Sequence, residues 1–251
     1  MTLAPPDVGR LDEHDQIHVW IIHADAVRLD ELTPLLAADE VERAARFHFD
    51  RDRARFIVRR AHLRRLLGAY LDLDSASIRF AATGTGKPVL GWPATDLHFS
   101  VSQSGDIGVC AVGRDHPIGV DVERIRTGVV DTLASGVCTP NERAALTEIR
   151  PEVREAAFFT LWTHKEALVK ADGRGLSLPV ASIDVATALT DRKVDTRLPG
   201  TEGDTPYVSR TIALDGAFTA AVARRAQAVT VRSRAAVPTP GGRPQRRLRR
   251  T

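Results

Sequence analysis

Two carboxylates interrupt an otherwise apolar segment, PIGVDVERI, at residues 117–125. Its β-branched residues predict a strand, in which Asp121 and Glu123 point to the same face because they are two positions apart. A strand edge with one solvated face is one explanation for such a pair. The other is a divalent cation, because Mg²⁺ takes carboxylate oxygens as ligands and keeps waters or phosphates in its remaining positions. The choice depends on what else the chain supplies.

A third carboxylate lies on a helix predicted within EAAFFTLWTHKEALVKADGRGLSLP, residues 155–179. Apolar residues recur there at spacings of three, four and seven, which indicates one buried stripe, and Gly173 ends the helix. Glu166 and Lys170 are four residues apart and share a face. As an exposed ion pair they would contribute only ~0.3–0.5 kcal/mol. As part of a site, Glu166 would be a third oxygen ligand, and Lys170 would reach the anion that the metal binds.

The composition is that of a globular protein with one large core or two small ones, since 43% of the 251 residues are hydrophobic. No apolar run approaches the ~20 residues that a membrane span needs, and the first 16 residues do not resemble a signal peptide. We therefore expect a cytoplasmic protein with no membrane partner. Cys110 and Cys138 lie in or near apolar segments, which predicts buried free thiols in a reducing compartment.

The charge is unevenly distributed along the chain. Residues 237–251 carry five arginines and no acid, so the formal charge of +3 depends on this tail, and the rest of the chain is slightly acidic. A segment rich in Pro, Gly and Arg buries too little apolar surface to offset its ordering entropy, which predicts disorder. Only four basic residues are lysines, Lys87, Lys165, Lys170 and Lys193. Their retention in an arginine-rich chain makes them candidates for specific roles.

Short sequence matches predict an internal duplication. Three of them recur in the same order, about 100 to 110 residues apart: ERAA at 42–45 and 142–145, ASI at 76–78 and 181–183, and GDIGVCAV at 105–112 with DGAFTAAV at 215–222. Chance produces any one of these matches, whereas three in order favour a duplicated α+β unit of about 100 residues, a size that fits the chain length.

The expected fold class is therefore α+β, with two pseudo-symmetric α/β subdomains and the active site at their interface. We expect an N-terminal tail at 1–14, a first subdomain at 15–116, a second subdomain at 117–228 and a basic, disordered tail at 229–251. Local patterns predict a strand at 17–26, a helical region at 39–71, and two strands within 97–113. The acidic segment falls where the two subdomains meet, and such interfaces favour ligand clefts.

These features together resemble the 4'-phosphopantetheinyl transferases, specifically the longer two-domain bacterial type of polyketide and nonribosomal peptide biosynthesis. GVDVE followed by WTHKEALVKADGRGLSLP is similar to the paired signature of that family. RFHFDRDRAR, GKP and HFSVSQSG lie upstream in the order and at the spacings of the family, so the resemblance covers about residues 17–225. It implies Mg²⁺-dependent transfer of the 4'-phosphopantetheine arm from coenzyme A to a serine of an apo acyl or peptidyl carrier protein, releasing 3',5'-ADP. We also expect a monomer, since the duplicated halves would form the cleft within one chain.

The resemblance assigns roles to individual positions. The implied magnesium ligands are Asp121, Glu123 and Glu166. The implied catalytic residues are Glu166, as the base or as the residue that orients a basic water, and Lys170. The implied contacts to coenzyme A come from Arg55, Lys87, Ser102, Gln103, Lys165 and Lys170. At Gln103 the chain departs from the family, which usually has histidine there, and glutamine can donate a hydrogen bond but carries no charge.

Two other functions account for single features of the sequence. A metal-dependent phosphohydrolase would use the same acids, but enzymes with an Asp-x-Asp nucleophile motif need a second aspartate where this chain has Glu123. A nucleic-acid-binding protein would use DRDRARFIVRRAHLRR, residues 50–65. That stretch also carries regularly spaced apolar residues, which indicates an amphipathic helix with a solvated basic face. We therefore favour the transferase and expect no nucleic-acid partner.

Overall fold

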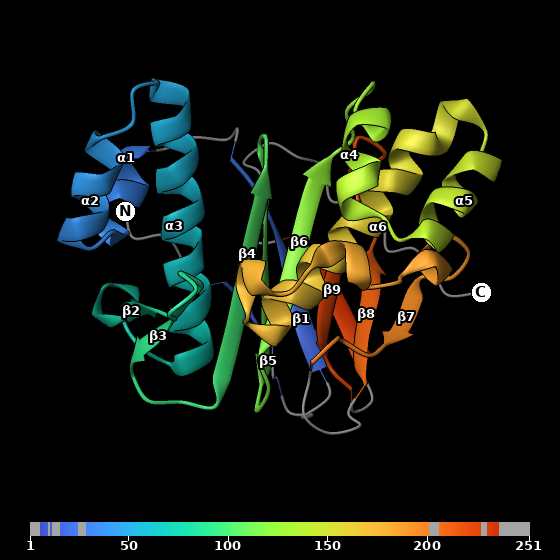
Figure 1. Ribbon diagram of the computed structural model, residues 1–251. Helices are drawn as coiled ribbons and strands as arrows, with labels where there is room; N and C mark the ends of the chain where they lie inside the picture. The colour runs from blue at the N-terminus through green and yellow to red at the C-terminus, as the bar shows by residue number, and fades with distance from the viewer. Residues whose placement is uncertain are drawn as a thin grey trace, which may run out of the picture.

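The computed structural model describes residues 6–9, 11, 16–24, 29–200, 206–226 and 230–235. Within these residues, two four-stranded sheets lie between two long helices, α3 and α6, and a separate two-stranded sheet lies beside α3 (Figure 1). No helix among the described residues is long and apolar enough to cross a membrane. Cys110 and Cys138 are buried free thiols, as the sequence predicted.

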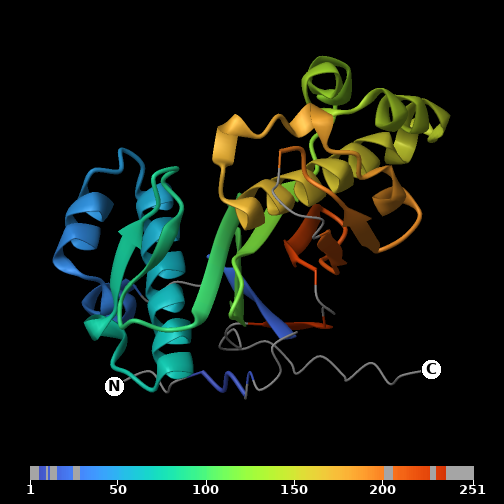
Figure 2. The same ribbon diagram turned by 60° about the horizontal axis from the view of Figure 1, so that its bottom comes forward.

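The N-terminal half forms most of the first sheet, whose strand order is β10-β1-β5-β4, and the β2-β3 hairpin. Turned by 60°, the molecule shows this hairpin against α3 (Figure 2). The elements of this half are β1 (Gln16–His23), α1 (Leu29–Leu32), the 3₁₀ helix η1 (Thr33–Leu35), α2 (Ala38–Ala45), α3 (Asp50–Leu71), η2 (Ser75–Ser77), β2 (Arg79–Ala82), β3 (Pro88–Trp92), β4 (Leu97–Ser104) and β5 (Ile107–Arg114).

The C-terminal half forms the second sheet, whose strand order is β6-β9-β8-β7, and it also supplies β10 of the first sheet. Its elements are β6 (Ile118–Arg124), α4 (Val130–Val137), α5 (Pro140–Glu148), α6 (Pro151–Asp172), η3 (Gly175–Ser177), η4 (Val180–Ser182), η5 (Ala186–Leu189), β7 (Lys193–Thr196), β8 (Tyr207–Ile212), β9 (Phe218–Arg225) and β10 (Thr230–Ala235).

The two halves repeat one topology, which confirms the α+β class and the duplication. In the first half β1 pairs antiparallel with β5, and β5 pairs antiparallel with β4. In the second half β6, β9 and β8 repeat this arrangement. The long helices α3 and α6 have 22 residues each. The two ERAA matches fall in equivalent helices, α2 and α5.

The predicted boundaries need three corrections. The helical region expected at 39–71 is interrupted at residues 46–49, between α2 and α3. Leu11, expected in a tail, is buried in the N-terminal core. The tail expected at 229–251 is wrong for Thr230–Ala235, which pairs parallel with β1 as strand β10 because the edge of β1 offers unpaired backbone groups. The rest of that tail, 236–251, and residue 229 lie outside the described residues.

Burial alternates along the strands and separates the core into layers. On β6 the side chains of Ile118, Val120 and Val122 pack between the two sheets. Since successive strand residues point to opposite faces, Gly119, Asp121 and Glu123 point away from that layer. Gly119 marks their direction, because a Cβ atom built there would lie 1.8 Å from the carbonyl oxygen of Ala167 on α6. The two acids of β6 therefore lie on the face that α6 covers.

Candidate active site

Serine side chains join the edge strands of the two sheets, β4 and β6. Ser100 Oγ accepts a hydrogen bond of 3.1 Å from the backbone nitrogen of Val120. Four residues further along β4, Ser104 Oγ accepts one of 3.0 Å from the backbone nitrogen of Arg124. Residues at this spacing share a strand face, and Ser102 lies between them. The SVSQS segment thus connects the two halves at the acidic strand.

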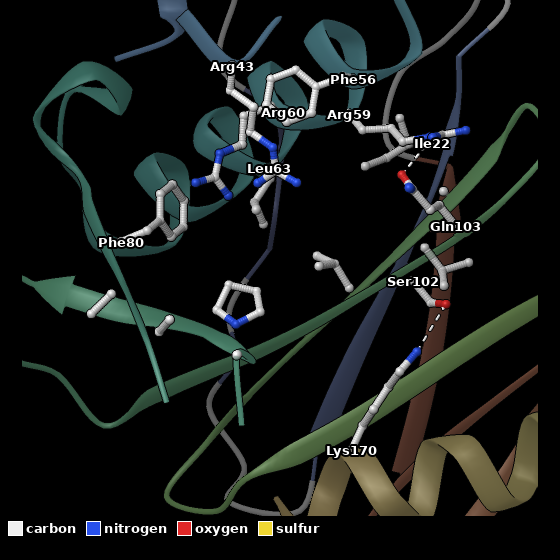
Figure 3. A pocket seen from close by; sticks show the side chains of 17 residues that line it. Ile22, Arg43, Phe56, Arg59, Arg60, Leu63, Phe80, Ser102, Gln103 and Lys170 are labelled. Atoms are coloured by element: carbon white, nitrogen blue, oxygen red, sulfur yellow. Dashed lines mark hydrogen bonds between the residues drawn. The ribbon is translucent and has the colours of Figure 1, made fainter. Parts of the chain in front are cut away.

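Asp121 is held from both sides of this junction. Ser102 Oγ donates a hydrogen bond of 2.7 Å to Asp121 Oδ1, and Lys170 Nζ from α6 donates one of 2.7 Å to the same oxygen. Lys170 Nζ also lies 3.2 Å from Ser102 Oγ, a contact visible in Figure 3. The Asp121 side chain is 6% exposed, and its second oxygen, Oδ2, is buried without a hydrogen-bond partner in the structure. Asp121 therefore keeps one oxygen available for a ligand.

Glu123 and Glu166 complete a group of three carboxylates around this position. Ser104 Oγ donates a hydrogen bond of 3.0 Å to Glu123 Oε2. Burial raises the pKa of Glu123, and the charge of Asp121 raises it further. Burial also raises the pKa of Glu166, to which the charges of Asp121 and then Glu123 add. The three carboxylates therefore repel one another, and a bound cation would remove that repulsion.

The magnesium ligands expected from the sequence are these three carboxylates. Across the described part of the chain, no three His, Cys, Asp or Glu side chains gather closely enough to form a complete metal site as they stand. The chemistry of the donor set nevertheless fits a hard cation, because the charges of the three carboxylates act on one another and one buried oxygen, Asp121 Oδ2, has no partner in the structure.

Two cavities border Lys170. One, of about 580 Å³, extends from Lys170 and Ser102 toward α3 (Figure 3). Its wall on that side includes Arg43, Phe56, Arg59, Arg60 and Phe80. The other, of about 690 Å³, includes Glu166 and is otherwise walled mainly by apolar residues such as Trp162, Val169, Leu178 and Val180. Lys170 thus lies between a basic cavity and a mainly apolar one, and Glu166 borders the second.

Comparisons with known proteins agree with this arrangement. Residues 23–114 match the family described as "4'-phosphopantetheinyl transferase, N-terminal", and residues 117–222 match the "4'-phosphopantetheinyl transferase superfamily". The 4'-phosphopantetheinyl transferase HetI of Nostoc sp. is 35% identical over 192 residues, which are 74% of this chain and 80% of that protein. The chain belongs to the 4'-phosphopantetheinyl transferase family.

Two further relatives place the transferase with the two-domain bacterial type. A 4'-phosphopantetheinyl transferase of Bacillus subtilis is 34% identical over 194 residues, 77% of this chain and 84% of that protein. The 4'-phosphopantetheinyl transferase Sfp of Bacillus subtilis (strain 168) is 28% identical over 187 residues, 74% of this chain and 81% of that protein. The matches therefore extend over both halves of the fold.

Two of the basic residues expected to bind coenzyme A have protein partners in the transferase. Lys87 Nζ donates hydrogen bonds of 2.6 Å to the carbonyl oxygens of Ile118 and Lys170, so it connects the β2-β3 hairpin to β6 and α6. Burial, with a contribution from the charge of Lys170, lowers the pKa of Lys87 to about 8. Arg55 Nε donates a hydrogen bond of 2.8 Å to Asp106 Oδ1, which raises the pKa of Arg55.

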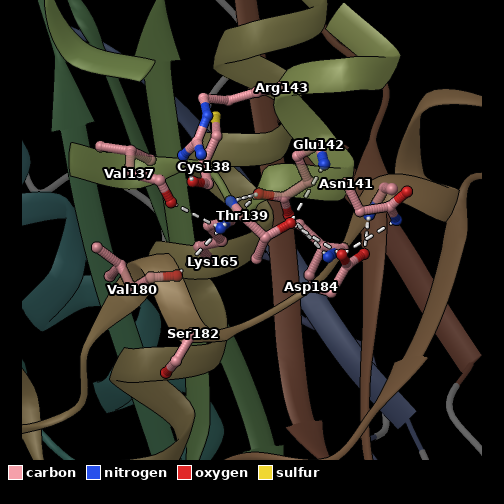
Figure 4. A network of polar contacts seen from close by, with 12 residues as sticks. Val137, Cys138, Thr139, Asn141, Glu142, Arg143, Lys165, Val180, Ser182 and Asp184 are labelled. Carbon is pink, nitrogen blue, oxygen red and sulfur yellow. Dashed lines mark hydrogen bonds and ion pairs between the residues drawn. The ribbon is translucent and has the colours of Figure 1, made fainter. Parts of the chain in front are cut away.

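Lys165 lies away from the carboxylate group. Its side chain is 1% exposed, and its Nζ lies 2.7 Å from Glu142 Oε2 and donates to the carbonyl oxygens of Val137, at 2.7 Å, and Val180, at 3.0 Å (Figure 4). Adjacent helix residues point about 100° apart, so Lys165 and Glu166 face different neighbours. The expected contact between Lys165 and coenzyme A is not supported by this position, which instead ties α6 to α5 and η4.

The sequence did not single out the arginines that face the basic cavity. Arg59 and Arg60 were included in a solvated basic face of the helix, whereas α3 turns them toward the cavity. The guanidinium of Arg60 stacks 3.9 Å above the Phe80 ring and pairs with Glu40. The sequence could predict only part of this arrangement. Helical spacing places Arg59 and Arg60 on the same face of the helix as Phe56, but it does not predict what lies opposite that face.

Proposed function

We propose that this transferase moves the 4'-phosphopantetheine arm of coenzyme A to a serine hydroxyl of an apo acyl or peptidyl carrier protein and leaves 3',5'-ADP. The observation that carries this proposal is the position of Asp121. Its Oδ1 accepts hydrogen bonds from Ser102 and Lys170, whereas its buried Oδ2 has no partner in the structure. This arrangement supports a site in which one oxygen of the carboxylate positions Lys170 and the other binds a ligand.

Asp121, Glu123 and Glu166 would hold Mg²⁺. When bound, the ion would offset the charge of the pyrophosphate and remove the repulsion among the three acids. Ser102 and Ser104 fix the first two carboxylates through hydrogen bonds of 2.7 and 3.0 Å. The serines thus pre-organise the acidic site from the opposite half of the fold.

The reaction needs a base for the carrier serine and a cation near the pyrophosphate. Glu166, or a water that it orients, would accept the serine proton. The serine oxygen then bonds to the β-phosphorus, and the bond from that phosphorus to the bridging oxygen breaks. Lys170, which borders both cavities, would stabilise charge on the phosphates.

The cavities on either side of Lys170 suit the two ends of coenzyme A. The cavity walled by Arg43, Arg59 and Arg60 would take the charged nucleotide end. The mainly apolar cavity beside Trp162 and Glu166 would take the uncharged pantetheine arm. Ser102 and Gln103 on β4 would approach the phosphates, because both line the basic cavity.

A single chain supplies both cavities and all three carboxylates, so we propose a monomer as the active unit. The two buried free thiols fit a reducing cytoplasm, which is our proposed location.

The test is chromatographic detection of 3',5'-ADP after incubation with coenzyme A, Mg²⁺ and a panel of apo carrier proteins. We expect release that requires Mg²⁺, stops with EDTA, and is lost when the acceptor serine of the carrier is replaced by alanine. Release that is independent of any carrier would instead indicate phosphohydrolase chemistry. No release with any carrier would contradict the proposed acceptor class.

A further inference from the structure

Gln103 is the position where the chain departs from its family, and its side chain contacts an arginine of the opposite wall. Arg59 Nη1 donates a hydrogen bond of 2.6 Å to Gln103 Oε1, as Figure 3 shows. Arg59 Nη2 donates to the carbonyl oxygen of Gly105, in the turn that follows β4. Both residues line the basic cavity. One side of the guanidinium is therefore fixed by the β4–β5 turn.

The hydrogen bonds that the structure describes for Arg59 include none to a carboxylate. Both of these hydrogen-bond partners are neutral carbonyl oxygens, whereas Arg60 pairs with Glu40 and Arg55 pairs with Asp106. Burial lowers the pKa of Arg59 and the charge of Arg55 lowers it further, whereas the charges of Asp106 and Asp52 raise it in part. The Nε atom of Arg59 is buried and has no hydrogen-bond partner in the structure. A partly buried guanidinium whose hydrogen-bond partners are neutral oxygens is a favourable place for an anion.

The fold also makes room for this side chain. Gly108 on β5 lines the same cavity, and a Cβ atom built there would lie 3.3 Å from Arg59 Cγ and 3.4 Å from Arg59 Cδ. The missing side chain at Gly108 thus lets the stem of Arg59 lie against β5 while the guanidinium reaches the turn. Contacts of both its aliphatic part and its guanidinium therefore fix the position of Arg59.

We propose that Arg59, positioned by Gln103, supplies to a phosphate of coenzyme A the positive charge that Gln103 itself cannot carry. Gln103 is then a positioning residue, and Arg59 is the residue that contacts the anion. This inference rests on the proposed function, because it assumes that the basic cavity takes the nucleotide end of coenzyme A. The anion is either the 3'-phosphate or the pyrophosphate, which share the same recognition chemistry.

The test is a set of dissociation constants, measured by calorimetry with Mg²⁺ present, for coenzyme A and for 3'-dephospho-coenzyme A. Arg59→Gln should weaken coenzyme A binding about tenfold or more, because hydrogen bonds between charged groups are the strong ones. Gln103→Ala should weaken it a few-fold. The double variant should bind no more weakly than Arg59→Gln alone, because Gln103 acts through Arg59. Arg53→Gln, an exposed arginine of the same helix, is the matched control and should bind as the wild type does.

The two ligands identify which phosphate is bound. A loss confined to coenzyme A would assign Arg59 to the 3'-phosphate, and an equal loss for both ligands would assign it to the pyrophosphate. Unchanged binding of both ligands by Arg59→Gln, or independent, multiplying effects of the two substitutions, would overturn the proposal. If Arg59→Gln does not fold, Gln103→Glu keeps the arginine and neutralises it, and it must weaken binding as strongly. Because binding is measured, a wild type that binds coenzyme A without transfer would refute only the proposed function.

Discussion

Lys170 on α6 donates a hydrogen bond of 2.7 Å to Asp121 Oδ1 on β6, and this ion pair joins two motifs that lie 49 residues apart in the chain. Neither motif is specific alone, since an acidic strand edge and a helical Glu-Lys pair are both common. Their contact turns two weak signals into one site. Substitutions of Lys170 and Asp121 can therefore be distinguished, by their effects on activity and stability, from substitutions of residues that only stabilise the fold.

Asp121→Asn should abolish transfer while the protein remains folded. The substitution removes the charge that the proposed Mg²⁺ site requires, and an amide of the same shape keeps the packing at β6. We expect the rate at saturating Mg²⁺ and coenzyme A to fall at least a hundredfold, with an unchanged far-UV circular dichroism spectrum. Retention of more than a tenth of the wild-type rate would show that Asp121 is not a metal ligand.

Lys165→Met should mainly reduce stability, whereas Lys170→Met should mainly reduce activity. Lys165→Met leaves Glu142 buried without its cation, and breaking a buried ion pair costs ~3–5 kcal/mol in the free energy of unfolding. Lys170 is 29% exposed, so its loss should change stability far less but should greatly slow transfer. Urea unfolding and transfer assays on both variants check this. Equal stabilities would show that the Lys165 pair is dispensable for the fold.

Gly119→Ala should destabilise the C-terminal half, because the added Cβ would lie 1.8 Å from the Ala167 carbonyl oxygen and neither backbone can yield cheaply. Gly136→Ala is the matched control. It adds the same methyl group to helix α4, where a Cβ atom would meet nothing within 4 Å beyond the adjoining part of its own helix, and alanine favours the helix. Thermal midpoints should therefore fall for Gly119→Ala and stay or rise for Gly136→Ala. A Gly119→Ala midpoint equal to the wild type would mean that β6 and α6 are further apart than described.

His164 makes stability fall on acidification. It is buried between Ser209 and Thr211 on β8, and burial lowers its pKa from 6.5 to about 4. Below pH 6.5 the unfolded chain therefore binds a proton that the folded protein excludes until about pH 4, so stability decreases across that window. The loss between pH 7 and pH 5 is about 2 kcal/mol. His18 and His62 have the same direction of shift and add to it.

Urea unfolding of wild type and His164→Gln at both pH values isolates this contribution. The variant lacks a group that titrates in the window, so its free energy of unfolding should depend less steeply on pH, whatever its stability at pH 7. The same slope in both proteins would show that His164 is accessible to protons in the folded state.

The sequence predicted the α+β class, the duplication and the acidic strand because these follow from local patterns. Alternation along 118–124 assigns Asp121 and Glu123 to one face, and Gly119 on that face allows α6 to approach. The sequence could not predict that Thr230–Ala235 would return to pair with β1, since parallel pairing between chain ends depends on a free strand edge in the folded sheet.

Motif resemblance predicted the positions of site residues whose side chains face the cavities. It did not predict the position of a neighbouring residue whose side chain points elsewhere. Lys165 was grouped with Glu166 by motif, but its helical direction takes it into an ion pair with Glu142. The sequence showed that Gln103 stands where the family usually has histidine, whereas its hydrogen bond with Arg59 of α3, 44 residues earlier in the chain, depends on the fold. Residue spacing within a single helix or strand cannot predict such tertiary contacts.

On this view, the junction of the two halves transfers phosphopantetheine to a carrier serine. Intact-mass spectrometry of an apo carrier protein, incubated with coenzyme A, Mg²⁺ and either wild type or Asp121→Asn, tests it most directly. The account predicts that the wild type adds the mass of one phosphopantetheine group, only to a carrier that keeps its acceptor serine, and that the variant adds none. An unmodified carrier with the wild type across the panel, or equal modification by Asp121→Asn, would contradict it.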